Sequence, residues 1–303
     1  MSRRVLILVS LLLIASTACN RPLRKNFVST ATLPQNKGPA QTGSFDGELT
    51  SNGVSRHFCL HVPQDYQADT SFPLIVNFHG YGSNSLEEEK LTGMSVKADT
   101  AGFIVVYPDG LNNAWNDGPG ANGKADLQFI RDLISYIESQ YNIDPKRIYA
   151  TGISNGGGMT NRLGCDMADL IAAIAPDSGA YNLWENCSPS RPMPVLAFHG
   201  LNDNVVPYEG GNQRIMEPPI EDWAASWARR NGCSSTPETT NPEEDVTVRT
   251  WSNCQDHADV ILYALANHGH SWPGSLTMPK SITSQAVNAT DVIWDFFVAH
   301  PMP

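Results

Sequence analysis

The sequence predicts a single α/β domain built on a mostly parallel central β-sheet with helices on both faces. Segments typical of strands and of helices alternate from residue 45 to the C-terminus, which is the pattern of a parallel sheet covered on both sides. Several strand segments are short apolar runs that end in turn residues, as buried parallel strands do. The sequence shows no internal repeat, and we expect no second domain.

The expected strands are short and apolar. In chain order they are 56–63, 72–80, 103–110, 147–154, 171–179, 193–203, 246–251 and 258–270. The expected helices are 85–102, 125–141, the segment after Ser154, 221–232 and 289–300. The clearest helix has apolar residues at helical spacing on one side: Leu127, Ile130, Ile134, Ile137 and Tyr141.

Residues 1–18 predict an export signal, with Arg3 and Arg4 followed by an apolar stretch and a small-residue exit. The apolar stretch is too short to span a bilayer. Cys19 stands where bacterial lipoproteins are cleaved and lipidated, although Ser16 occupies a position that is usually leucine. Lipidation at Cys19 and simple secretion both remain open. Residues 19–44 are polar and rich in proline and glycine, so we expect a flexible tether before a domain at 45–303.

The net charge of the 303-residue chain is −11 at pH 7. Nucleic acids and anionic membrane surfaces attract basic patches, so neither is expected as a main partner. We expect the protein to act on a small or oligomeric substrate, as a monomer.

Six cysteines in an exported chain predict disulfides. Cys233 and Cys254 flank a polar loop, and Cys165 and Cys187 bracket a strand with its loop, so these are the expected pairs. Cys59 is then expected to be buried and free, and Cys19 to be lipidated or removed. No cysteine spacing indicates zinc, and His268 and His270 have no third ligand nearby, so we expect neither metal nor cofactor.

Ser154 lies in an unusually glycine-rich stretch, "GISNGGGM". A β-prone run precedes it and a helix-prone run follows. Strand, sharp turn and helix is the context of the G-x-S-x-G elbow that carries a serine nucleophile, whereas a linker would be polar on both sides. The glycines relieve crowding at the turn and allow close packing at the start of the helix.

A serine nucleophile needs a base oriented by an acid. On α/β-hydrolases the chain order is serine, acid, histidine, and Ser154, Asp203 and His270 fit it, each just after an apolar strand. Asp177 is the alternative acid and His268 the alternative base. His199, at the start of the turn that carries Asp203, is interpreted as structural support.

Acyl transfer also needs two backbone N–H groups that stabilise the oxyanion. Asn155, directly after the nucleophile, is expected to supply one. Tyr81 in "HGYGSN" is expected to supply the other, because Gly80 and Gly82 let the backbone approach closely.

Taken in order, "HGYGSN", "AWNDG", "GISNGGGM", "IAPDSG", "HGLND", "VPYEGG" and "GHSWPG" resemble the poly(3-hydroxybutyrate) depolymerase-like and feruloyl esterase family. The resemblance covers nearly all of the chain from Ser44 onward. It implies an α/β-hydrolase fold, cofactor-free serine esterase chemistry, and the same roles for Ser154, Asp203 and His270. It also implies that Trp115 and Trp272 line the substrate pocket, although buried tryptophans that only pack are common.

The sequence therefore predicts an exported carboxylic ester hydrolase that works through an acyl-enzyme. Hydroxycinnamoyl (feruloyl) esters of plant polysaccharide are the favoured substrates. Acetylated xylan and short 3-hydroxybutyrate oligomers are the alternatives. From a different class, a non-catalytic glycan-binding surface protein would keep the fold without the chemistry.

Overall fold

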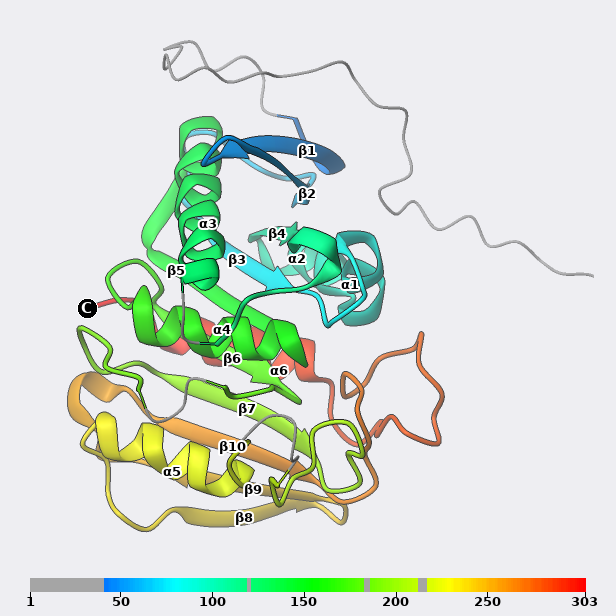
Figure 1. Cartoon of the computed structure of the whole chain (residues 1–303), viewed down its shortest axis with the longest axis vertical. Coiled ribbons are helices and arrows are strands. Elements are labelled where there is room, and N and C mark those ends of the chain that lie inside the picture. Colours follow the sequence, from blue (N-terminus) through cyan, green and yellow to red (C-terminus); the bar gives the residue numbers. More distant parts are fainter. Residues whose placement is uncertain (1–40, 119–120, 183–185, 212–216) are drawn as a thin grey trace, which may run out of the picture.

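A ten-stranded β-sheet runs through the part of the chain that the computed structural model describes, residues 41–118, 121–182, 186–211 and 217–303 (Figure 1). The strands are β1 (Gly43–Ser51), β2 (Val54–Val62), β3 (Phe72–Phe78), β4 (Ile104–Pro108), β5 (Ile143–Ile153), β6 (Ala173–Asp177), β7 (Val195–Gly200), β8 (Glu238–Glu243), β9 (Val246–Trp251) and β10 (Val260–Leu265).

The strand order across the sheet is β1-β2-β4-β3-β5-β6-β7-β10-β9-β8. The central strands from β4 to β10 in this order pair in parallel. Antiparallel pairs close the sheet at both ends, β1 and β2 on one side and β9 and β8 on the other. The predicted mostly parallel sheet is confirmed.

The helices are α1 (Ser85–Thr92), α2 (Met94–Ala101), α3 (Ala121–Gln140), α4 (Asn155–Asp166), α5 (Ile220–Arg230) and α6 (Ala289–Ala299), with short 3₁₀ turns at Leu111–Asn113 and Gln255–His257. Helices α3, α4 and α5 cover one face of the sheet, where Phe129, Leu163 and Trp227 enter one buried apolar cluster. Helices α2 and α6 cover the other face, where Ala98 and Phe297 enter a second cluster. The sheet is therefore buried on both sides by apolar contacts.

The structure differs from the expected elements in three places. The helix expected at 85–102 is two helices, because Gly93 takes a left-handed conformation (φ 61°) that ends α1 and starts α2. Strands β1 and β8 were not predicted. β1 begins at Gly43, two residues inside the segment expected to be a tether, and β8 is exposed along its whole length. Pairing with β2 and with β9 makes strands of sequences that carry little strand signal of their own.

Both expected disulfides, Cys165–Cys187 and Cys233–Cys254, are present. The expectation that Cys59 is a free thiol is wrong, because its buried sulfur is disulfide-bonded. Spacing along the chain does not fix disulfide connectivity, which is why the sequence misled at this position. The predicted export signal, the lipidation of Cys19 and nearly all of the tether lie outside the described residues. Across the described ranges, no helix has the length and apolar character needed to cross a membrane.

Candidate active site

The three strands that carry the predicted catalytic residues all run in the same direction. β5 leads into Ser154, β7 into the turn with Asp203, and β10 into the loop with His270. The strands lie in the order β5-β6-β7-β10, so their carboxyl ends share one edge of the sheet. Active groups of open α/β sheets collect at this edge.

Ser154 sits on a strained turn between β5 and α4, with φ 59° and ψ −121°. Such a backbone costs a non-glycine residue about 1–3 kcal/mol and persists only where the surroundings enforce it. Here the Ser154 N–H donates to the Asp177 carbonyl at 3.0 Å, and the N–H groups of Gly158 and Ala180 donate to the Ser154 carbonyl at 2.9 and 3.1 Å. This is the geometry of a nucleophile elbow.

Two glycines beside Ser154 are required by close backbone packing. A Cβ on Gly152 would lie 2.5 Å from the Phe78 carbonyl oxygen, and one on Gly156 would lie 2.1 Å from the same atom. Both distances are far below a normal contact. The end of β3 therefore presses against the elbow only because these positions lack side chains.

Asp203 and His270 are joined by a hydrogen bond of 2.7 Å from His270 Nδ1 to Asp203 Oδ2. The other carboxylate oxygen accepts the N–H groups of Val205 and Val206 at 2.8 and 2.9 Å. Burial opposes ionisation of Asp203, but the bond and charge of His270 and these N–H groups lower its pKa overall. An ionised Asp203 fixes the proton on Nδ1 and leaves Nε2 of His270 to act on another group.

The loops that carry Asp203 and His270 are packed backbone to backbone. The N–H of Asn202 donates to the His268 carbonyl at 3.0 Å, and a Cβ on Gly200 would lie 2.2 Å from that carbonyl oxygen. This contact explains how two residues from separate strands keep hydrogen-bonding distance.

The neighbouring histidines are held by backbone groups. His268 is fully buried, with Nε2 donating to the Ser271 carbonyl and Nδ1 accepting the Ser284 N–H. His199 donates from Nε2 to the Val206 carbonyl at 2.8 Å, and burial lowers its pKa to about 4. His268 therefore has no ring nitrogen left for a base, and His199 braces the turn that carries Asp203.

The alternative acid, Asp177, has a different environment. It is fully buried at the end of β6, and burial together with the charge of Asp203 raises its pKa well above the usual range. Its side chain accepts only from Ser178, at 3.3 Å, and no histidine bonds it among the described residues. The geometry brings His270 to Asp203 and not to Asp177.

The two predicted oxyanion donors lie beside the elbow. A Cβ on Gly80 would lie 3.4 Å from Ser154 Cβ, so the turn before Tyr81 contacts the serine directly. Within the described part of the chain, neither the Tyr81 N–H nor the Asn155 N–H donates to an acceptor. The Tyr81 side chain is 80% exposed.

The two tryptophans expected to contact substrate are both buried. Trp115 is 4% exposed and donates from Nε1 to the His79 carbonyl at 3.1 Å. Trp272 is 1% exposed, donates to Thr290 Oγ1 at 3.0 Å, and belongs to the core cluster on the α2 and α6 face. These placements favour the packing alternative, and the predicted substrate contacts stay predictions.

Two acidic residues that the sequence did not single out lie close to the predicted site. Asp117 is buried next to α4, accepts Asn182 Nδ2 at 3.1 Å, and has its pKa raised by burial to about 6. Glu217 is 5% exposed, and neither of its oxygens has a hydrogen-bond partner in the described ranges. Burial, then the charges of Asp203 and Asp117, raise its pKa to about 7. Asp117 lies within the "AWNDG" motif, where Trp115 was the residue selected, and no motif contains Glu217.

No metal site accompanies these groups among the described residues, since no three His, Cys, Asp or Glu side chains there could hold a metal ion.

Two esterases are similar in sequence to most of this chain. The chain is 35% identical over 232 residues to feruloyl esterase B of Piromyces equi, covering 71% of this chain and 42% of that protein. It is 29% identical over 251 residues to the bifunctional acetylxylan esterase/xylanase XynS20E of Neocallimastix patriciarum, covering 80% of this chain and 33% of that protein. The chain thus spans less than half the length of these two relatives.

Among solved structures, an acetyl xylan esterase from Aspergillus awamori superposes with a TM-score of 0.63 at 16% identity, covering 84% of this chain and 98% of that one. At this identity the match shows the fold, which is the α/β-hydrolase fold. The family model described as esterase PHB depolymerase matches residues 57–209, which is half of the chain and runs from within β2 to beyond Asp203. The chain belongs to the esterase PHB depolymerase family.

Proposed function

We propose that this protein is an exported serine carboxylic ester hydrolase in which Ser154 is the nucleophile, His270 the general base and Asp203 the acid that orients it. The observation that carries the proposal is the 2.7 Å Asp203–His270 hydrogen bond at the same sheet edge as the strained Ser154 turn. Family membership and esterase relatives support the same chemistry.

In the proposed first step, Nε2 of His270 takes the proton from Ser154 Oγ as the oxygen attacks the ester carbonyl carbon. The carbonyl oxygen becomes an oxyanion, and the N–H groups of Tyr81 and Asn155 donate to it. His270 then passes its proton to the leaving alcohol, and an acyl-enzyme on Ser154 remains. Ionised Asp203 stabilises the charge on His270 in both stages.

In the second step, water replaces the alcohol. His270 takes a proton from the water, the hydroxyl attacks the acyl carbon, and the same two N–H groups stabilise the second oxyanion. Return of the proton to Ser154 Oγ releases the carboxylic acid. Every proton movement uses residues of this chain.

The favoured substrates are hydroxycinnamoyl esters such as feruloyl groups on plant polysaccharide, because one relative at 35% identity is a feruloyl esterase. Acetylated xylan is the second candidate, since the other relative and the superposed structure are acetylxylan esterases by name. Short 3-hydroxybutyrate oligomers are the third, from the family description.

Export is supported by the disulfides, which persist in oxidising compartments. We propose residues 1–18 as the signal and the segment from 19 to the start of β1 at Gly43 as a tether. Simple secretion and a monomeric state belong to the same proposal, with lipid attachment at Cys19 as the alternative to secretion. Labelling with a radioactive fatty acid, with Cys19→Ala as control, tests the attachment, and light scattering tests the mass.

The deciding experiment compares wild type, Ser154→Ala and, as a control, Ser235→Ala at an exposed turn position. The panel is p-nitrophenyl acetate, methyl ferulate, acetylated xylan and a 3-hydroxybutyrate oligomer. We expect hydrolysis by wild type and Ser235→Ala and a loss of at least about 10⁴-fold in Ser154→Ala. Folded wild type that is inert on the whole panel would favour a non-catalytic glycan-binding protein instead.

A further inference from the structure

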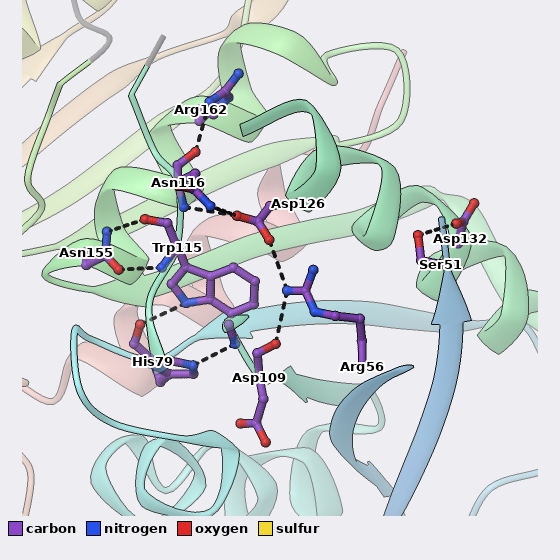
Figure 2. Close-up of polar contacts among 11 residues, drawn as sticks. Ser51, Arg56, His79, Asp109, Trp115, Asn116, Asp126, Asp132, Asn155 and Arg162 are labelled. Carbon is purple, nitrogen blue, oxygen red and sulfur yellow. Dashed lines mark hydrogen bonds and ion pairs between the residues drawn. The ribbon is translucent and has the colours of Figure 1, made fainter. Parts of the chain in front are cut away.

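The loop at residues 110–116, which holds Trp115, links the two backbone segments that carry the oxyanion N–H groups. These are the turn with Tyr81, after β3, and the elbow with Asn155, at the start of α4. Figure 2 shows Trp115 beside His79 and Asn155, with its indole ring bonded to His79 and its backbone bonded to Asn155. Its 4% exposure leaves almost no surface for a substrate.

On the elbow side, Trp115 and Asn155 form a closed pair of hydrogen bonds. The Trp115 N–H donates to Asn155 Oδ1 at 2.7 Å, and Asn155 Nδ2 donates to the Trp115 carbonyl at 3.0 Å. Because the side chain of Asn155 is fixed in this way, rotation of its own backbone N–H is restricted as well.

On the Tyr81 side, the indole Nε1 donates to the His79 carbonyl at 3.1 Å, and the Gly110 N–H donates to His79 Nε2 at 3.0 Å. Farther along the same turn, the Gly82 N–H donates to the Asn113 carbonyl at 2.7 Å. The His79–Gly80 and Tyr81–Gly82 peptide groups, which flank the peptide that carries the Tyr81 N–H, are therefore tied to the loop that holds Trp115.

The loop is itself anchored by a buried ion pair. Asp126 Oδ2 accepts both the N–H and the Nδ2 of Asn116, at 3.0 and 2.9 Å. Arg56 pairs with Asp126 Oδ1 at 3.0 Å and donates to the Asp109 carbonyl at 3.1 Å. The side chains of Arg56 and Asp126 are 3% and 1% exposed, so this anchor is shielded from water.

We propose that Trp115 is a positioning residue for the oxyanion hole: it bridges the Tyr81 turn and the Asn155 elbow and sets the distance between their N–H groups. The inference rests on the esterase function proposed above. Donors must lie 2.7–3.1 Å from the developing oxyanion, and shifts of about 1 Å can cost about 100-fold in rate. A bridge that bonds the Asn155 side chain on one side and the His79 carbonyl on the other can hold that precision without touching the substrate.

The test replaces Trp115 with phenylalanine, which keeps a ring for packing and removes the indole N–H. Trp227→Phe is the matched control, because Trp227, on α5, is also buried. Its Nε1 likewise donates a hydrogen bond, to Asn161 Oδ1 at 3.0 Å. For Trp115→Phe we expect kcat to fall about 10- to 100-fold with KM within about threefold. The factor should be the same for p-nitrophenyl acetate and methyl ferulate, and Trp227→Phe should keep wild-type kcat.

A second measurement separates a positioning effect from a general loss of stability. In the complex with benzeneboronic acid, Ser154 Oγ bonds to the boron, and the resulting tetrahedral anion binds in the oxyanion hole. Its inhibition constant should rise in Trp115→Phe by about the factor lost in kcat/KM, and the thermal midpoint should change no more than in Trp227→Phe. Asn155→Ala keeps the backbone N–H. If both residues act by positioning the same two N–H groups, adding this change to Trp115→Phe should lower kcat/KM little further.

Two results would overturn the inference while leaving the esterase function in place. One is a Trp115→Phe variant with kcat within twofold of wild type. The other is a loss that appears in KM and differs between the acetyl and feruloyl substrates, which would make Trp115 a substrate contact. Wild type without activity on any ester would instead count against the proposed function.

Discussion

Ser154 has backbone dihedral angles that its residue type disfavours. Its φ of 59° and ψ of −121° suit glycine, yet a serine occupies the position. Hydrogen bonds from Gly158 and Ala180 and the contact with Asp177 hold it there. The strain presents the hydroxyl at the end of β5, where the proposed nucleophile is needed.

We therefore expect Ser154→Gly to be more stable than Ser154→Ala by about 1 kcal/mol or more, with both variants inactive. Glycine adopts the backbone of the elbow without strain, whereas alanine keeps the Cβ. Denaturant unfolding of both variants measures the difference. Equal stabilities of the two variants would show that a residue with a Cβ adopts this turn without strain.

Glu217 is the other residue whose environment is costly. Its carboxyl is buried without a hydrogen-bond partner in the described ranges, and its pKa is raised from 4.5 to about 7 by burial and by the charges of Asp203 and Asp117. The folded state therefore favours the protonated form. The associated stability is fully present below about pH 4.5 and is lost as the pH rises through 7.

Glu217→Gln removes this titration. The free energy of unfolding of the variant minus that of wild type should increase by about 1–3 kcal/mol as the pH rises from 4.5 to 8. Unfolding in urea at several pH values measures this gain, with Glu48→Gln on the exposed side of β1 as control. A difference between wild type and Glu217→Gln that does not change with pH would contradict the prediction.

Helix α4 begins at the elbow, so its position against the sheet also fixes the position of Ser154. Its far end carries Cys165, bonded to Cys187, whose carbonyl accepts Arg230 Nε from α5 at 2.9 Å. In its middle, Asn161 Oδ1 accepts the indole N–H groups of Trp223 and Trp227. These contacts tie α4 to α5.

Replacing Cys165 and Cys187 by serine should lower the free energy of unfolding by about 3 kcal/mol, as expected for a disulfide that closes a loop with a sequence separation of 22. The kcat should change less than threefold, because the elbow lies at the opposite end of α4. Denaturant unfolding and steady-state hydrolysis of a single ester test both parts. A large loss of kcat in a folded variant would mean that the far end of α4 also controls the nucleophile.

At the scale of the whole molecule, one continuous sheet separates two apolar clusters. The edge that holds the proposed catalytic residues draws on strands from β5, at the centre of this sheet, to β10, so the proposed site depends on the integrity of most of the sheet. Neither cluster can form without the strands that the other also uses.

We expect a single cooperative unfolding transition with the disulfides intact. Far-UV circular dichroism and tryptophan fluorescence should then give coincident curves, and the calorimetric and van't Hoff enthalpies should agree. Two separated transitions would indicate that the sheet divides into independently stable parts.

Much of the fold could be predicted from the sequence because its signals are local. The apolar runs at β3, β4 and β7 and the helical spacing in α3 depend only on neighbouring residues. Ser154, Asp203 and His270 could be selected because each lies shortly after a strand, and parallel strands bring their carboxyl ends to one edge. The hydrogen bond between Asp203 and His270 agrees with that selection.

Other features depend on contacts between distant segments, which no local pattern encodes. Strand β8 exists because β9 pairs with it, and the disulfide at Cys59 depends on which sulfur is brought close. The burial of Trp115 depends on His79 and Asn155, which lie in other loops. The sequence by itself determined the order of elements and the chemistry at the strand ends, through residue type and period. Only the tertiary structure decided which groups lose water and which partners they meet, because burial and hydrogen bonding are properties of the folded neighbourhood.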